Sequence, residues 1–194
     1  GGPDLRHEGN TMRATLLIAA LALSACSTLL PGPRTTDATT TLIAADAATA
    51  LAVGERMTMT VQTPRAAPPE GEDPVILMQL RHQDGRVMQF DESNRAPMHL
   101  MAQAPGGPLA QIMGLFGEER PTLYGARRED GASAFFCGAD GPAAVGYYRA
   151  NDGDVRIVGL REEIAFETLA DGGMNALPYS PDRVCARLRF RIAG

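Results

Sequence analysis

The chain has 194 residues with a formal net charge of −5, and 44% of its residues are hydrophobic. This hydrophobic content is typical of a globular domain, and 21 Gly and 14 Pro are too few for a collagen-like or low-complexity chain. The acidic balance argues against a nucleic-acid-binding protein, because such proteins concentrate surplus basic charge on one face.

A short apolar segment lies near the N-terminus. Residues 14–23 read ATLLIAALAL, and Met12 and Arg13 precede them. Ten residues of helix span about 15 Å, roughly half of the hydrocarbon core of a bilayer, which is too short for a transmembrane helix. The pattern is typical of the hydrophobic region of an export signal. We expect translation to start at Met12, because Asp4 and Glu8 do not suit the positively charged start of such a signal.

The residues directly after this segment resemble the lipobox of bacterial lipoproteins. Leu23, Ser24, Ala25 and Cys26 provide a leucine, two small residues and the obligatory cysteine in the required order. The resemblance implies that the signal peptidase recognises the first three residues and cuts before Cys26. It also implies that the Cys26 sulfur carries diacylglycerol and that the new amino group carries a further acyl chain such as palmitate. Two or three acyl chains hold a protein on a membrane far more firmly than one.

The residue after the cysteine indicates the destination of such a lipoprotein. In lipoproteins sorted by the enterobacterial rule, an Asp at this position retains the protein in the inner membrane, whereas Ser27 stands here. The resemblance therefore implies an outer-membrane anchor that faces the periplasm. We expect a leader and signal peptide over residues 1–25, the lipidated Cys26 and a flexible tether over residues 26–41, and a single β-rich periplasmic domain over residues 42–194.

Most of the expected domain is predicted to form strands. Asp84-Gly85 favours a hairpin between two of them, because glycine supplies the positive φ that a tight turn requires. Residues 42–53 are compatible with either a short helix or a strand and its turn. Strand-like runs separated by turn residues stand at residues 56–62, 75–82, 86–91, 122–126, 132–137, 143–150, 155–160 and 186–192.

One short amphipathic helix is predicted between these strands. Its apolar residues, Leu109, Ile112, Met113 and Phe116, are spaced i, i+3, i+4 and i+7 and follow Pro108. We expect this apolar face to pack on the sheet. The strand spacing and the short helix together predict a mainly β fold, a small antiparallel sandwich or partly open barrel with one or two short helices.

Two cysteines remain after Cys26. Cys137 and Cys185 are predicted to form a disulfide, because the periplasm is oxidising. A redox or metal-binding thiol pair is the alternative, but the two cysteines lie far apart in the sequence and form no C-x-x-C motif.

The last predicted strand carries a basic stripe. Arg187, Arg189 and Arg191 alternate with Leu188 and Phe190, so one face of the strand is apolar and the other is basic. The stripe suits phosphate groups of lipid A, another anionic ligand or an acidic partner protein. The structural interpretation, which we prefer, is a solvated face or charge that discourages edge-to-edge pairing of a terminal strand.

A group of methionine and histidine residues suggests an alternative function. Met98, His99 and Met101, together with His82, provide the thioether and imidazole ligands that suit Cu(I). The structural alternative is that methionine fills the core, since the chain has nine Met and no Trp. Our main expectation is that the protein holds no cofactor, with copper as the alternative.

The sequence contains no catalytic motif that we recognise. It has no G-x-S-x-G and no H-E-x-x-H pattern. We therefore expect a non-catalytic lipoprotein that binds an envelope component or partner protein. A lipobox followed by a small disulfide-containing β domain also looks like the lipoproteins that inhibit lysozyme, which is a further alternative. The Ser-Gly-x-x-Tyr type of loop of one such family is absent from the sequence, so no inhibitory residues are carried over.

Overall fold

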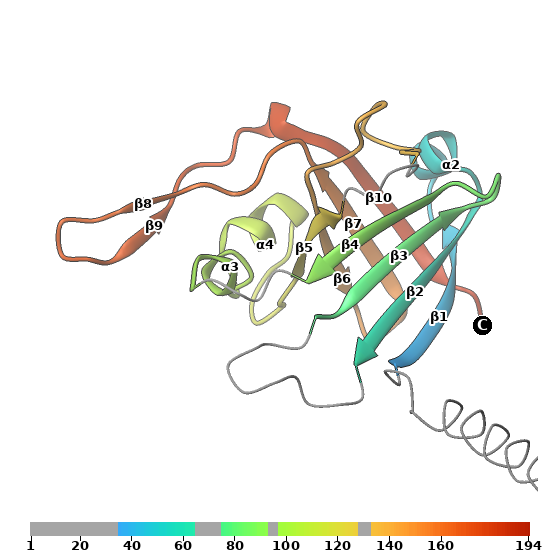
Figure 1. Cartoon of the computed structure of the whole chain (residues 1–194), viewed down its shortest axis with the longest axis horizontal. Helices are drawn as coiled ribbons and strands as arrows, with labels where there is room; N and C mark the ends of the chain where they lie inside the picture. The colour runs from blue at the N-terminus through green and yellow to red at the C-terminus, as the bar shows by residue number, and fades with distance from the viewer. Residues whose placement is uncertain (1–34, 65–74, 93–96, 128–132) are drawn as a thin grey trace, which may run out of the picture. The chain divides into compact units, whose positions relative to one another are not determined.

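Eight antiparallel strands close into a barrel (Figure 1). The computed structural model describes residues 35–64, 75–92, 97–127 and 133–194, with the backbone alone at residues 35 and 97–99. The barrel strands are β1 (Thr35–Ala44), β2 (Arg56–Pro64), β3 (Leu77–His82), β4 (Val87–Glu92), β5 (Thr122–Arg127), β6 (Ala144–Arg149), β7 (Asp154–Leu160) and β10 (Val184–Ile192). The prediction of a mainly β, antiparallel fold is confirmed, and the barrel is closed.

The barrel is of the up-and-down type. Strands β1 to β7 pair in chain order, β7 pairs with β10, and β10 closes the barrel by pairing with β1. A two-stranded hairpin of β8 (Phe166–Thr168) and β9 (Met174–Ala176) is inserted between β7 and β10 and extends away from the barrel (Figure 1). This hairpin was not predicted.

Large apolar side chains fill the inside of the barrel. Leu188 and Phe190, the apolar residues of the last predicted strand, are 2% and 0% exposed. Their alternation with arginine is therefore confirmed as an inward and an outward face. Four methionines belong to the same core, so methionine acts here as a flexible core filler. The largest fully buried side chains of this core include Leu42, Met57, Met78, Leu80, Phe90, Val145, Ile157, Leu188 and Phe190.

Two short helices cover part of the outside of the barrel. Helices α3 (Pro97–Ala102) and α4 (Pro108–Met113) contribute to a second core with outward-facing side chains of β5 and β7. On β6, a Cβ added to Gly146 would lie only 2.6 Å from Leu109 of α4. Glycine at this position therefore lets the helix approach the sheet closely. The expected packing of this helix on the sheet is confirmed.

A loop closes the barrel end at which β3 meets β4. The strand predicted over residues 132–137 is wrong for the described residues 133–137, which form bends and bury Phe135 and Phe136 in the core. The loop is held by a disulfide between Cys137 and Cys185, whose Cα atoms lie 5.1 Å apart. The predicted disulfide is therefore confirmed. We call residues 133–137 the plug loop, because its Phe135 and Phe136 side chains are buried in the core although the segment is not a strand.

The folded part of the chain begins earlier than expected. Strand β1 starts at Thr35, so residues 35–41, which we assigned to the tether, pair with β2. Residues 42–53 are resolved as the end of β1 followed by helix α2 (Ala47–Val53). Thr35–Gly194 form one compact unit. Within the described residues we find no helix with both the length and the hydropathy that a bilayer crossing requires.

Candidate functional site

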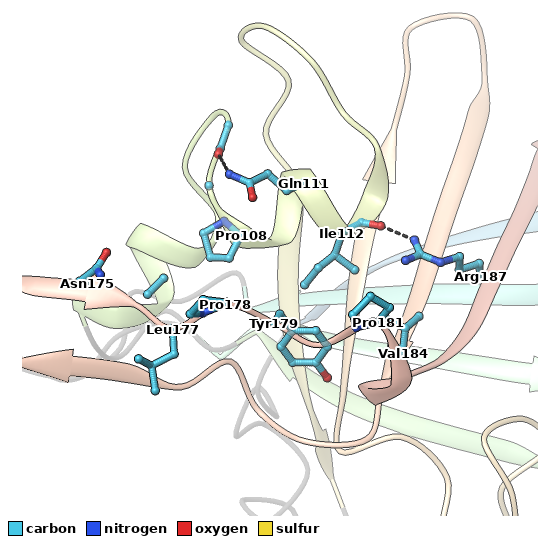
Figure 2. Close-up of a pocket in the computed structure, with 13 residues that line it drawn as sticks. Pro108, Gln111, Ile112, Asn175, Leu177, Pro178, Tyr179, Pro181, Val184 and Arg187 are labelled. Atoms are coloured by element: carbon cyan, nitrogen blue, oxygen red, sulfur yellow. Dashed lines mark hydrogen bonds between the residues drawn. The ribbon is translucent and has the colours of Figure 1, made fainter.

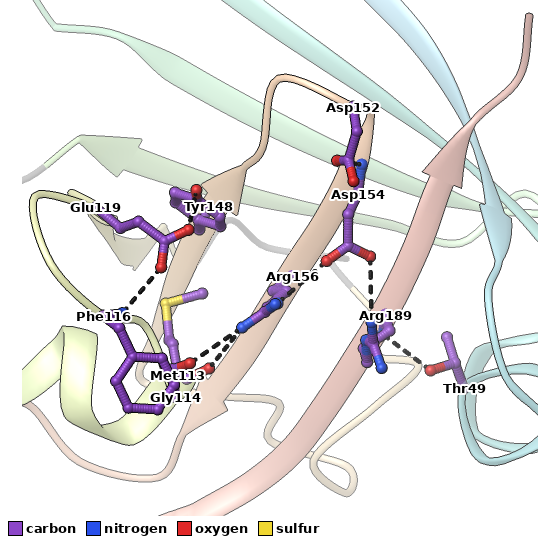
Figure 3. A network of polar contacts seen from close by, with 10 residues as sticks. All are labelled: Thr49, Met113, Gly114, Phe116, Glu119, Tyr148, Asp152, Asp154, Arg156 and Arg189. Atoms are coloured by element: carbon purple, nitrogen blue, oxygen red, sulfur yellow. Dashed lines mark hydrogen bonds and ion pairs between the residues drawn. The ribbon is translucent and has the colours of Figure 1, made fainter.

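The basic stripe of β10 continues on the neighbouring strand. Arg187 and Arg189 are exposed on β10, and the strand register places Arg156 of β7 directly opposite Arg189. These three arginines line a groove of about 300 Å³ on the outer face of the barrel, next to Met113 and Gly114 at the end of α4. We call this feature the cationic groove. Figure 3 shows two of its arginines, Arg156 and Arg189, on adjacent strands.

One carboxylate faces these arginines within the network of Figure 3. Asp154 accepts from Arg156 Nε at 3.2 Å and lies 3.5 Å from Arg189 Nη2. Its side chain is only 18% exposed, whereas that of Arg189 is 57% exposed. Asp154 thus pairs with two of the three arginines, and Arg189 remains accessible from solvent.

The arginines also cap the C-terminus of α4. Arg156 Nη1 donates to the carbonyl oxygens of Gly114 at 3.2 Å and Met113 at 3.5 Å. Arg187 Nη1 donates to the carbonyl oxygen of Ile112. Cations are favourable at this end of a helix because its last carbonyls lack intrahelical partners. These contacts orient two guanidinium groups, and each guanidinium has five N–H donors, so further donors remain for a ligand.

Phe116 lies beside the cationic groove and not in the core. We predicted it on the buried face of the helix, but Gly114 ends α4 in a left-handed conformation with φ 65°, and Leu115 takes the buried place. Phe116 is 82% exposed. Its N–H donates to Glu119 Oε2 at 2.9 Å, and the Tyr148 hydroxyl donates to Glu119 Oε1 (Figure 3). The Tyr148 hydroxyl and the Phe116 N–H lower the pKa of Glu119, so the turn that presents Phe116 is stabilised by an ionised carboxylate.

A second groove of about 550 Å³ lies on the other side of α4, between this helix and the segment after β9 (Figure 2). We call it the proline-lined groove. Arg187 lines both grooves and reaches Ile112 between them. The proline-lined groove is formed mainly by Pro108, Ile112, Leu177, Pro178, Tyr179 and Pro181.

The structure brings only part of the predicted arginine stripe into this site. Arg187 and Arg189 line the cationic groove, whereas Arg191 is exposed and lies outside it. Arg156 was missed by the sequence reasoning. Arg156 alternates with Asp154 on one strand, which is the only local signal of its position, and the sequence does not show which strand pairs with this one. The lipobox residues, Leu23, Ser24, Ala25 and Cys26, lie outside the described residues.

The residues of the copper alternative lie on two elements, with Met98, His99 and Met101 on α3 and His82 on β3. The side chains of Met98 and His99 fall outside the described part, and Met101 on α3 is 37% exposed. His82 lies at the end of β3, where its Nδ1 is 2.8 Å from Asp84 Oδ1 and its ring is 5.2 Å from that of Phe135. Over the described ranges, no three His, Cys, Asp or Glu side chains form a group that could hold a metal ion.

Comparison of the chain with protein-family models, with curated proteins and with solved structures found no match.

Proposed function

We propose that the protein is an outer-membrane-anchored periplasmic lipoprotein that binds an anionic envelope component in the cationic groove and performs no catalysis. The observation that carries the binding proposal is the juxtaposition of Arg156, Arg187 and Arg189 around one groove with Asp154 as their carboxylate partner. Arginine is suited to phosphate and carboxylate groups, because its planar guanidinium donates two parallel hydrogen bonds to them.

Two features support a site on the outside of the barrel. Side chains such as Phe90, Phe190 and Leu80 fill the interior and are fully buried, which leaves the outer surface for a ligand. The arginines are already held by α4 and Asp154, so less side-chain entropy is lost when a ligand binds. A surface that presents pre-oriented guanidinium groups favours an anion over a neutral ligand.

The membrane anchor follows from the lipobox at residues 23–26. Eight residues separate Cys26 from Thr35, the first residue of β1. They span at most about 29 Å when fully extended. A lipid on Cys26 therefore keeps the barrel close to the membrane surface and raises the effective concentration of membrane components around the groove.

The anchor is tested by labelling cells that express the chain with an alkyne analogue of palmitate. The wild-type protein is expected to take up the label, and Cys26→Ser is expected to lose it. An unlabelled wild-type protein would overturn the anchor.

Anion binding is tested on residues 26–194 carrying Cys26→Ser, exported with a cleavable secretory signal so that the disulfide forms without a lipid. Isothermal titration with pyrophosphate is expected to show binding that weakens as salt is raised. Replacing Arg156 and Arg189 together by Ala is expected to weaken binding at least tenfold. Arg191→Ala removes an exposed arginine of the same strand outside the groove and is the matched control. Equal losses in both variants would contradict the groove as the site.

A further inference from the structure

One edge of strand β9 has no neighbouring strand. Leu177 N donates to the carbonyl oxygen of Ala165 at 3.0 Å, so the backbone groups of Leu177 point towards the β8 side. Residues of an antiparallel strand direct their N–H and C=O groups alternately to its two sides. The backbone groups of Met174 and Ala176 therefore point away from β8. In the described part of the chain this sheet consists of β8 and β9 alone, so that side of β9 is an open edge.

The hairpin of β8 and β9 is a small sheet that a third strand would complete. Its two strands have three residues each. A two-stranded hairpin is marginally stable on its own, and an open edge is a template for pairing with another chain. Leu169 and Leu177 of the hairpin segment are also 43% and 39% exposed. Both the backbone edge and these side chains are therefore available to a partner.

The proline-lined groove borders this open edge. Asn175, Ala176 and Leu177 line one side of it, and Pro108 and Ile112 of α4 line the other (Figure 2). Its volume of about 550 Å³ lies within the size range of ligand sites. Its lining mixes amide groups with apolar side chains, which suits a peptide, because a peptide carries a polar backbone together with its side chains. The groove therefore offers space for an extended peptide between β9 and α4.

Arg187 is the one charged side chain among the described residues that line this groove. It lies at the end of the groove that is far from Asn175 (Figure 2). Its Nη1 donates to the carbonyl oxygen of Ile112, which orients the guanidinium and leaves further donors for a ligand. A guanidinium binds a carboxylate by two parallel hydrogen bonds. The charge of the groove therefore favours a peptide with an acidic side chain at the position that reaches Arg187.

We infer that the proline-lined groove binds an extended acidic segment of a partner protein, which adds a strand to β9. The backbone of this segment pairs with the N–H and C=O of Ala176, and its carboxylate accepts from Arg187. In strand addition, backbone hydrogen bonds provide affinity and side-chain contacts provide specificity. This inference goes beyond the proposed function and does not depend on it, because the peptide contacts neither Arg156 nor Arg189.

The inference is tested first by selecting peptides from a random heptapeptide library displayed on phage. The immobilised protein is the exported, Cys26→Ser form of residues 26–194, and phage that bind the bare surface are removed beforehand. The selection is expected to enrich peptides that share an Asp or Glu at one position. The most enriched peptide is then synthesised and its affinity is measured by isothermal titration. A selection that enriches no peptide would overturn the inference.

Variants of the protein assign the selected peptide to the groove. Ala176→Pro removes the N–H at the open edge and is expected to weaken binding at least tenfold. Ala176→Ser is the matched control, because it changes the side chain and keeps the N–H, and it is expected to bind within about twofold of the wild type. Arg187→Gln is expected to weaken the peptide at least fivefold, whereas Arg191→Gln, on the same strand outside the groove, is expected to leave it unchanged. Circular dichroism checks that each variant is folded.

Modified peptides test strand pairing on the unchanged wild-type protein. A series of peptides carries one N-methyl group each, at successive positions, which removes one backbone donor at a time. Because alternate N–H groups of a strand face the same side, methylation is expected to weaken binding at least tenfold at every second position of the bound stretch and much less between them. Replacing the acidic residue of the peptide by its amide is expected to abolish the effect of Arg187→Gln.

The remaining outcomes separate this inference from the proposed anion site. Equal sensitivity to methylation at successive positions, or equal binding to Ala176→Pro and Ala176→Ser, would overturn strand addition. A peptide that is lost when Arg156 and Arg189 are replaced and that is unaffected by Arg187→Gln would overturn the proline-lined groove as its site. Pyrophosphate is expected to bind Ala176→Pro as it binds the wild type. Failure of pyrophosphate to bind the wild type would overturn the proposed function and not the peptide site.

Discussion

Removing the disulfide between Cys137 and Cys185 should destabilise the barrel strongly. The bond joins residues 48 positions apart and holds the plug loop, with its buried Phe135 and Phe136, to β10. A cross-link limits the conformations of the unfolded chain. For a loop of this length, the chain-entropy estimate of its effect is about 4 kcal/mol in the free energy of unfolding, and typical measured values are about 2–4 kcal/mol.

The plug has other contacts that should keep the reduced domain folded. Arg86 Nη1 donates to the carbonyl oxygen of Ala134 at 3.0 Å, and the Arg86 guanidinium lies 5.9 Å from the centre of the Phe135 ring. The His82 ring packs against the same phenylalanine. Domains of this size are commonly stable by about 5–15 kcal/mol, so a loss of 2–4 kcal/mol leaves a folded but less stable barrel.

Urea unfolding followed by far-ultraviolet circular dichroism provides the assay, because the chain has no Trp to report by fluorescence. The starting protein carries Cys26→Ser. Replacing Cys137 and Cys185 together by Ala is expected to lower the free energy of unfolding by about 2–4 kcal/mol. Adding a reductant should lower that of the disulfide-bonded protein by a similar amount and leave the double variant unchanged. A double variant within about 1 kcal/mol of the oxidised protein would refute this reasoning.

Two further predictions concern packing and pH. Gly159→Ala should lower the free energy of unfolding by about 1–3 kcal/mol in the same assay, because its Cβ would lie 2.6 Å from Cys137 Sγ; unchanged stability would contradict this packing. The side chain and backbone N–H of Arg86 hold the pKa of Asp84 below its ordinary value of 3.8. The ionised Asp84 carboxylate therefore stabilises the folded state at a pH above that value, and this stabilisation is lost as the pH falls below it. The urea midpoint should fall less on acidification in Asp84→Asn than in the control Glu163→Gln, and equal falls would contradict the assignment.

The sequence was most informative where one face of an element is buried. Leu188 and Phe190 alternate with arginine because β10 separates the core from solvent, and this period of two identified the strand. The hairpin of β3 and β4 was found for a local reason. Gly85 has φ 93° in the turn between them, which favours glycine at that position.

The sequence was misleading where burial does not alternate. The first part of β1 pairs with β2, and β10 pairs only with Leu42–Ala44, so residues 36–39 are exposed on both faces. A run of Thr, Asp and Ala with no apolar period then resembles a tether. At the plug, Phe135 and Phe136 are adjacent in sequence and both buried, which a half-exposed strand does not allow. In both segments, exposure and burial depend on which strands and loops of the folded barrel cover the residues. The periodicity within one segment does not report this.

The cationic groove depends on a neighbour relation that the sequence does not contain. Arg187 and Arg189 were found because they share a strand, whereas Arg156 faces Arg189 only because β7 pairs with β10. The hairpin of β8 and β9 stands between these strands in the chain but forms a separate sheet, so the next strand in sequence is not the next strand in the barrel. Asp154 then neutralises part of the charge of Arg156 and Arg189, and α4 orients Arg156. The pairing of β7 with β10 thus turns a one-strand stripe into a groove lined by arginines of two strands.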